Sequence, residues 1–196
     1  MPNQKINKYK ISLGGVLDDI SDAVSFCIAP AVIFYLVMQR FEFAENSNLP
    51  IIYLSFGYTL LGITRLLFFI FDQNKIPGFF KGLPVPGAAL FVTAPLIILD
   101  SVMDAGKVDQ YYWGYVSFCF MVLASILMNS YFIKYIHFGR LMSRNKFFLW
   151  LTIILILGFI FTPYFEYVAI IYSFIYIVSP IYTNQIITKI KSIESN

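Results

Sequence analysis

The chain has 196 residues, of which 59% are apolar and only 13% are charged. Both fractions lie far from those of a soluble globular domain, so the sequence predicts an integral membrane protein that forms one domain over residues 1–196. The net charge of +3 is small and falls in connecting segments, which argues for membrane lipids and against nucleic acid as a partner.

Runs of about 20 apolar residues predict an all-α, polytopic bundle of about six transmembrane helices. Residues 1–12 precede the first run as an N-terminal segment that we expect in the cytoplasm. This segment carries lysines like a signal peptide, but the aspartates after it interrupt the apolar core that cleavage requires. The expected helices are Leu13–Arg40, Pro50–Phe71, Val85–Leu99, Tyr111–Ile136, Phe147–Phe161 and Tyr164–Ile187.

Prolines mark three places along these helices. Pro30 predicts a kink in the first helix. The third helix is short and contains Pro86 and Pro95, so we expect it to be bent or tilted. The dipeptide Thr162-Pro163 predicts a tight hairpin between the fifth and sixth helices.

The segments between the expected helices alternate between basic and acidic or neutral. The positive-inside rule therefore places both termini in the cytoplasm of a bacterial-type inner (cell) membrane. It also places Asp18, Asp22, Arg65 and Lys81 toward that side. The basic residues of these segments are Lys5, Lys8, Lys10, Lys75, Lys81, Arg140, Arg144, Lys146, Lys189 and Lys191.

Cysteine and histidine offer little chemistry. Cys27 and Cys119 both fall inside apolar runs and are interpreted as small packing residues. His137 is the only histidine, so imidazole-based metal sites and Ser-His catalysis have little to draw on.

An acidic cluster opens the first apolar run, in the stretch from Gly14 to Asp22. Asp18 and Asp22 lie one helical turn apart and share a face, whereas Asp19 is rotated by about 100°. Ionisable groups at membrane depth are costly, which makes this pair a candidate functional site. Two alternatives stay open: acids in the first turn of a helix are favoured by its dipole, and acids at the membrane surface are simply solvated.

The pattern Gly14-x-x-x-Asp18-x-x-x-Asp22 resembles the second half of the CDP-alcohol phosphatidyltransferase signature, in which D-x-x-D-G-x-x-A-R is followed after eight residues by G-x-x-x-D-x-x-x-D. The run from Asp22 to Ala31, DAVSFCIAPA, is similar to the D-x-V-S-F-G-x-A-P-A run of the phosphatidylserine synthase branch. The run from Phe80 to Ala89, FKGLPVPGAA, resembles that branch's F-x-G-L-P-x-P-A-A-A loop.

This resemblance implies transfer of a phosphatidyl group from CDP-diacylglycerol to serine, giving phosphatidylserine and CMP. It implies that Asp18 and Asp22 hold Mg²⁺ or Mn²⁺, that Asp22 is also the base, and that the backbone at Gly14 passes close to the nucleotide. Hard cations take oxygen ligands and bridge phosphates, and a neighbouring carboxylate can accept the proton of a hydroxyl. An ordinary loop glycine remains the alternative for Gly14. The resemblance also suggests a homodimer.

The first half of the signature departs from this pattern. Counting back from Gly14, the family arginine and alanine would fall on Lys5 and Gln4, and the D-G pair at or before Met1. The phosphatidylserine synthase branch typically has eight spans, so we expect a family member that lacks its first two helices. A second hypothesis follows: a truncated or degenerate, non-catalytic member that acts as a membrane-embedded binding or partner subunit.

Two basic residues complete the candidate site. The run from Thr64 to Phe69 is similar to the family's R-L-A-R-F-N, with Phe68 and Ile70 replacing the second arginine and the asparagine. Arg65 is therefore expected to bind phosphate or a substrate carboxylate, and snorkelling to the interface is the alternative. Lys81, with Gly82, is expected to approach a lipid phosphate.

Other polar residues carry weaker expectations. Arg140, Arg144 and Lys146 are candidates for anionic headgroups or for topology alone. Asn129 and Ser130 are expected to make helix–helix hydrogen bonds. A transporter is a third hypothesis, weakened because the polar residues gather at one face rather than at the bilayer midplane.

Overall fold

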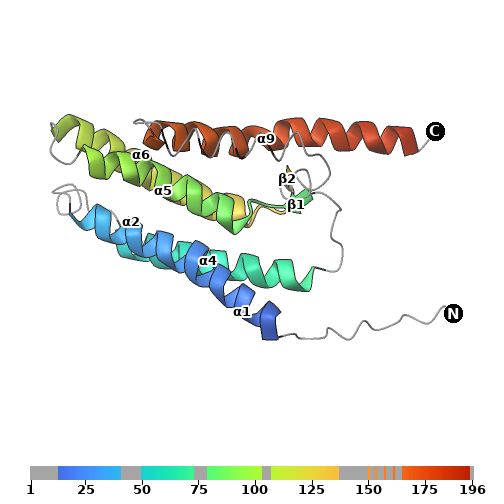
Figure 1. Cartoon of the computed structure of the whole chain (residues 1–196), viewed down its shortest axis with the longest axis horizontal. Coiled ribbons are helices and arrows are strands. Elements are labelled where there is room, and N and C mark those ends of the chain that lie inside the picture. The colour runs from blue at the N-terminus through green and yellow to red at the C-terminus, as the bar shows by residue number, and fades with distance from the viewer. Residues whose placement is uncertain are drawn as a thin grey trace.

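Helices dominate this protein, as expected for an all-α bundle (Figure 1). The structure, a computed structural model, describes residues 13–40, 50–72, 79–102, 107–136 and 165–194, with positions 150, 153, 157 and 161. The helices are α1 (Leu13–Asp22), the π-helix η1 (Ala23–Ile28), α2 (Ala29–Gln39), α4 (Ile51–Phe71), α5 (Val85–Ser101), α6 (Lys107–Met128) and α9 (Phe165–Glu194).

Within the described residues, three helical segments are long and apolar enough to cross a membrane: Leu13–Gln39, Ile51–Phe71 and Asp109–Met128. Val85–Ser101 and Tyr167–Ile181 are shorter apolar helices. The expected helix Phe147–Phe161 falls mostly outside the described residues, and its four described residues, Trp150, Ile153, Leu157 and Phe161, are helical and exposed. These segments indicate association with a membrane.

The helices run roughly along one axis (Figure 1). Helices α1, η1 and α2 follow one another as one continuous helix, which packs antiparallel to α4. Helix α5 contacts α2, α6 and α9. The start of α1 and the end of α9 lie toward the same end of the bundle as strands β1 and β2 (Figure 1).

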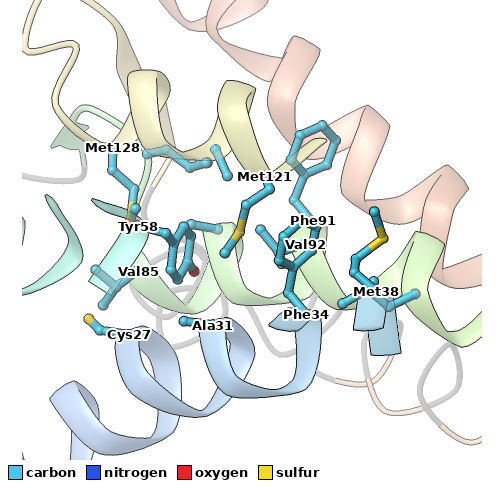
Figure 2. Close-up of a cluster of buried hydrophobic side chains, with 14 of the residues drawn as sticks. Cys27, Ala31, Phe34, Met38, Tyr58, Val85, Phe91, Val92, Met121 and Met128 are labelled. Atoms are coloured by element: carbon cyan, nitrogen blue, oxygen red, sulfur yellow. The ribbon is translucent and has the colours of Figure 1, made fainter. Parts of the chain in front are cut away.

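Helix α5 is the centre of the bundle. Ten of its 17 residues are buried and cover most of its circumference, while Pro86, Leu90 and Ile97 are exposed along the remaining side. A helix that is apolar on all sides suits a position surrounded by other helices. Figure 2 shows its core side chains meeting those of the first helix, α4 and α6. The labelled residues are Cys27, Ala31, Phe34, Met38, Tyr58, Val85, Phe91, Val92, Met121 and Met128.

The expected disturbance at Pro30 takes the form of the π-helix η1, which ends two residues before it. A proline has no N–H to donate to the carbonyl four residues earlier, here that of Phe26. The Tyr58 hydroxyl of α4 donates to that carbonyl instead, at 3.1 Å. The Thr59 hydroxyl shares its proton between the carbonyls of Ser55, at 3.1 Å, and Cys27, at 3.3 Å. Side chains of α4 thus satisfy backbone groups at the irregular turn.

The prediction of a helix over Tyr111–Ile136 is wrong at its C-terminal end, because α6 stops at Met128. The next segment approaches the chain before α5: the Leu83 amide donates to the carbonyl of Leu127 at 3.0 Å, and the Gly82 amide to that of Ile133 at 2.7 Å. These two bonds join the segment before α5 to the end of α6 and to the residues that follow it.

Strand β2 (Lys134–Ile136) then pairs antiparallel with β1 (Phe79–Lys81), a two-stranded sheet that the sequence did not predict. The paired residues are Phe79 with Ile136, Phe80 with Tyr135, and Lys81 with Lys134.

The two polar residues after α6 behave differently. The Asn129 side-chain amide donates to the carbonyl of Leu61 in α4 at 3.4 Å, an interhelical hydrogen bond as expected. The Ser130 hydroxyl donates within its own segment, to the carbonyl of Ile126 at 2.8 Å.

Candidate functional site

Helix α1 carries the acidic part of the candidate site. Asp18 and Asp22 lie four residues apart on this helix and so share a face. Asp18 is exposed and Asp22 half-buried, and no residue of α1 is buried. The position of Gly14 is open to the described residues, since a Cβ added there would meet none of them within 4 Å. The two carboxylates are therefore accessible from this part of the structure.

Asp18 and Asp22 fit a hard divalent cation whose remaining ligands are water and substrate phosphates. Among the described residues, no group of three or more histidine, cysteine or acidic side chains could hold a metal. Mg²⁺ is commonly bound through one or two carboxylates together with water and substrate phosphates. Asp18 and Asp22 could therefore supply the protein's share of such a coordination shell.

Arg65 lies at nearly the same depth in the bundle as Asp22. Gly62 of α4 packs against Cys27 of η1, with only 2.7 Å between an added Cβ and the Cys27 sulfur. Because the two helices are antiparallel, Arg65 lies about 4.5 Å beyond this contact, and Asp22 lies about 7.5 Å beyond it in the same direction. The acidic and basic residues thus occupy the same end of the bundle.

The Arg65 side chain is 5% exposed, so the snorkelling alternative does not describe it. Its Nε atom is buried without a hydrogen-bond partner in the described part of the chain. Gly82 makes this position possible: its φ is +80°, and an added Cβ would lie 2.7 Å from the carbonyl oxygen of Met128 and 3.5 Å from Arg65 Nε. Only glycine fits such a backbone conformation and such close contacts without strain.

Lys81 lies beside this position and is ion-paired. Its Nζ lies 2.8 Å from one carboxylate oxygen of Asp72 and 3.1 Å from the other, and about a quarter of each side chain is exposed. Asp72, the residue directly after α4, also interacts electrostatically with Arg65. Asp72 therefore links the two basic residues that the sequence singled out.

Two tyrosines interact with the Arg65 guanidinium, and a third packs against one of them. Tyr131 and Tyr176 interact electrostatically with Arg65, and the Tyr176 ring lies 5.5 Å from that of Tyr135. Burial raises the pKa of Tyr131, while the Arg65 charge lowers it. Burial alone raises the pKa of Tyr135 to about 12, and its hydroxyl has no hydrogen-bond partner among the described residues. Tyr131 and Tyr176 thus place two phenols near Arg65.

The structure therefore brings Arg65 and Lys81 together through Gly82 and Asp72, while Gly14, Asp18 and Asp22 lie on α1 at the same end. Arg140, Arg144 and Lys146 lie outside the described residues. Sequence reasoning missed Asp72, Lys134 and the three tyrosines. Only the Lys81-Gly82 pair, next to a proline-rich run, gave any signal of a special backbone there.

We compared the chain with family models, with curated proteins and with solved structures, and it matches none of them.

Proposed function

We propose that this protein is a membrane-embedded phosphatidyltransferase that moves the phosphatidyl group of CDP-diacylglycerol onto serine and releases CMP. The proposal rests on the resemblance of the acidic stretch and of the Phe80–Ala89 run to the phosphatidylserine synthase branch of the CDP-alcohol phosphatidyltransferases. One structural observation supports it most: two accessible carboxylates share a face of α1, at the end of the bundle where Arg65 and Lys81 lie.

Each residue has a role in the proposed reaction. Asp22 accepts the proton of the serine hydroxyl, whose oxygen forms a bond to the phosphatidyl phosphorus while the bond to the CMP oxygen breaks. Asp18 and Asp22 would hold Mg²⁺ or Mn²⁺, and the bound ion would supply positive charge to balance that on the leaving CMP. Arg65 and Lys81 attract the anionic groups of the substrates, and the open position of Gly14 gives the nucleotide room.

The proposal includes a topology. Six helices would cross a bacterial-type inner membrane, with residues 1–12, the C-terminus and the site on the cytoplasmic side. The alternation of basic and acidic segments supports this orientation. The start of α1 and the end of α9 lie toward the same end of the bundle, which is consistent with an even number of membrane crossings (Figure 1). In this arrangement a soluble acceptor and a lipid-linked nucleotide meet at the inner leaflet.

The test is CMP release from CDP-diacylglycerol and serine by the purified chain in detergent with Mg²⁺. We expect D22N to lose at least about 100-fold in rate, the lower range for loss of a general base. D18N should need more metal for the same rate. D19N is the matched control, because Asp19 is one residue away but faces elsewhere. Near-normal release by D22N, or release that ignores a chelator, would contradict the proposal.

A second candidate is a non-catalytic subunit that binds nucleotide lipid or a full-length partner. It is favoured by Phe68, which stands where the family has a second arginine: its side chain is apolar, 53% exposed and packed edge-on against Tyr131 at 5.4 Å. The same preparation distinguishes the two candidates. Retention of CDP-diacylglycerol without CMP release supports the subunit.

A further inference from the structure

A pair of lysines faces one side of the small sheet. Lys81 and Lys134 are directly opposite in the antiparallel register of β1 and β2, so their side chains leave the sheet on the same face. The neighbouring pair, Phe80 and Tyr135, leaves on the other face, where Tyr135 is fully buried. Like charges directly opposite each other destabilise a sheet unless an anion lies between them.

Asp72 is an anion beside these lysines, but it does not balance the charge. It bonds Lys81 through both carboxylate oxygens and also interacts with Arg65. Arg65, Lys81 and Lys134 carry three positive charges, whereas Asp72 carries one negative charge. The register places Lys81 opposite Lys134, and Gly82, the residue after Lys81, approaches Arg65 Nε, so the surplus of positive charge lies around this end of the sheet.

Arg65 supplies the second, independent observation. Its side chain is only 5% exposed, and its Nε–H has no acceptor among the described residues. A buried donor without an acceptor costs free energy comparable to a lost hydrogen bond, and more when the group is charged. Phosphate oxygens match guanidinium donors in geometry and charge.

The position of these basic residues relative to the ends of the membrane-crossing helices indicates which molecule would supply such a phosphate. The apolar helix α4 ends at Phe71, directly before Asp72, and the apolar helix α6 ends at Met128, six residues before Lys134. Residues just beyond the ends of membrane-crossing helices lie at the level of the lipid headgroups. Basic clusters in that layer bind anionic headgroups.

We propose that Arg65, Lys81 and Lys134 form a binding site for a phosphate group, supplied by an anionic phospholipid headgroup at this end of the bundle. The proposal adds Lys134 to the residues already considered, because neither its sequence context nor the proposed reaction singles it out. The inference rests on the proposed function in sharing Arg65 and Lys81 with it. Its test measures binding rather than transfer, so the two can fail separately.

The experiment titrates the full chain in detergent micelles with phosphatidic acid, phosphatidylcholine or inorganic phosphate, and follows the thermal midpoint and the lipid retained in native mass spectrometry. We expect phosphatidic acid to raise the midpoint and phosphatidylcholine to leave it unchanged. K134Q and K81Q should each weaken binding about fivefold, the value of one basic residue near an anionic lipid. R40Q is the control, because Arg40 ends the first helix at the opposite end of the bundle.

Each outcome decides the proposal. Sensitivity to K134Q and K81Q but not to R40Q supports the site, and a stronger response to phosphatidic acid than to inorganic phosphate assigns the headgroup as the source. R65K keeps the charge but loses the planar fork, so it should weaken binding even if R65Q fails to fold. Binding that K134Q and K81Q leave unchanged overturns the proposal. If D22N abolishes transfer yet binds phosphatidic acid normally, the two sites are separable.

Discussion

The Tyr58 hydroxyl donates a hydrogen bond of 3.1 Å to the carbonyl of Phe26, the backbone group that Pro30 leaves without its usual helical donor. Tyr58 is fully buried, so water cannot replace it there. An unpaired carbonyl is costly in an apolar environment. The bond therefore ties the irregular turn of the first helix to α4, and it lies between the helix that carries Asp18 and Asp22 and the helix that carries Arg65.

We predict that Y58F destabilises the protein by about 0.6 kcal/mol, and by no more than about 1.7 kcal/mol, the range measured for hydrogen bonds between membrane helices. Thermal or denaturant unfolding in detergent measures the change. In the P30A background an alanine N–H can serve the Phe26 carbonyl, so Y58F should cost less there. Equal costs in both backgrounds would show that the Tyr58 hydroxyl does not replace the donor that Pro30 lacks.

The contact between Gly62 and Cys27 gives a second prediction. A Cβ on Gly62 would lie 2.7 Å from the Cys27 sulfur, whereas one on Gly57, also in α4, would meet nothing within 4 Å. We expect G62A to destabilise the protein by about 1–3 kcal/mol through overpacking. G57A should be neutral or stabilising by up to about 1 kcal/mol, because alanine favours a helix. C27A should restore part of the loss in G62A, and failure to do so would locate the strain elsewhere.

The two ion pairs should differ in strength. Lys81 and Asp72 are less than a third exposed and 2.8 Å apart, whereas Arg40 and Asp100 are more than half exposed and 3.5 Å apart. Double-mutant cycles should give a coupling near 1 kcal/mol for the first pair and close to zero for the second. High salt should weaken the Lys81–Asp72 coupling only partly, because partly buried pairs are screened less. A larger coupling for Arg40–Asp100 would contradict this ranking.

Apolar runs were sufficient to predict most of the helices. Leu13–Arg40 and Pro50–Phe71 agree with the observed bounds within one residue. The third helix, expected over Val85–Leu99, begins as expected and ends two residues later, at Ser101. The end of α6 could not be predicted, because hydropathy continues through Tyr131 to Ile136. What stops the helix is a contact from elsewhere in the chain: the amide of Leu83 bonds the carbonyl of Leu127. Strand pairing across about 55 residues of chain leaves no local periodicity.

The candidate site was predictable only where spacing along a helix decides it. The separation of four residues put Asp18 and Asp22 on one face, and α1 retains that relation. Lys81 was singled out from its loop, but its partner Asp72 lies across a segment whose path the sequence does not specify. Lys134 was assigned to a helix, so its place opposite Lys81 could not be foreseen. Tertiary register, rather than local pattern, creates the basic part of the site.

Tyr135, which leaves the sheet on the face opposite Lys81 and Lys134, gives a prediction that depends on pH. Burial raises the pKa of its phenol to about 12 from an ordinary value of 10.0. Between these values the unfolded chain releases this proton while the folded chain keeps it, so the contribution to stability is complete below pH 10 and is lost as pH rises toward 12. The unfolding free energy of Y135F minus that of the wild type should therefore rise with pH over this window.

At neutral pH, Y135F should be neutral or stabilising by up to about 1 kcal/mol, because the hydroxyl has no acceptor among the described residues. Y112F, at an exposed tyrosine, should leave the stability at neutral pH unchanged. A loss of stability in Y135F at neutral pH would show that the hydroxyl is bonded and would contradict this prediction.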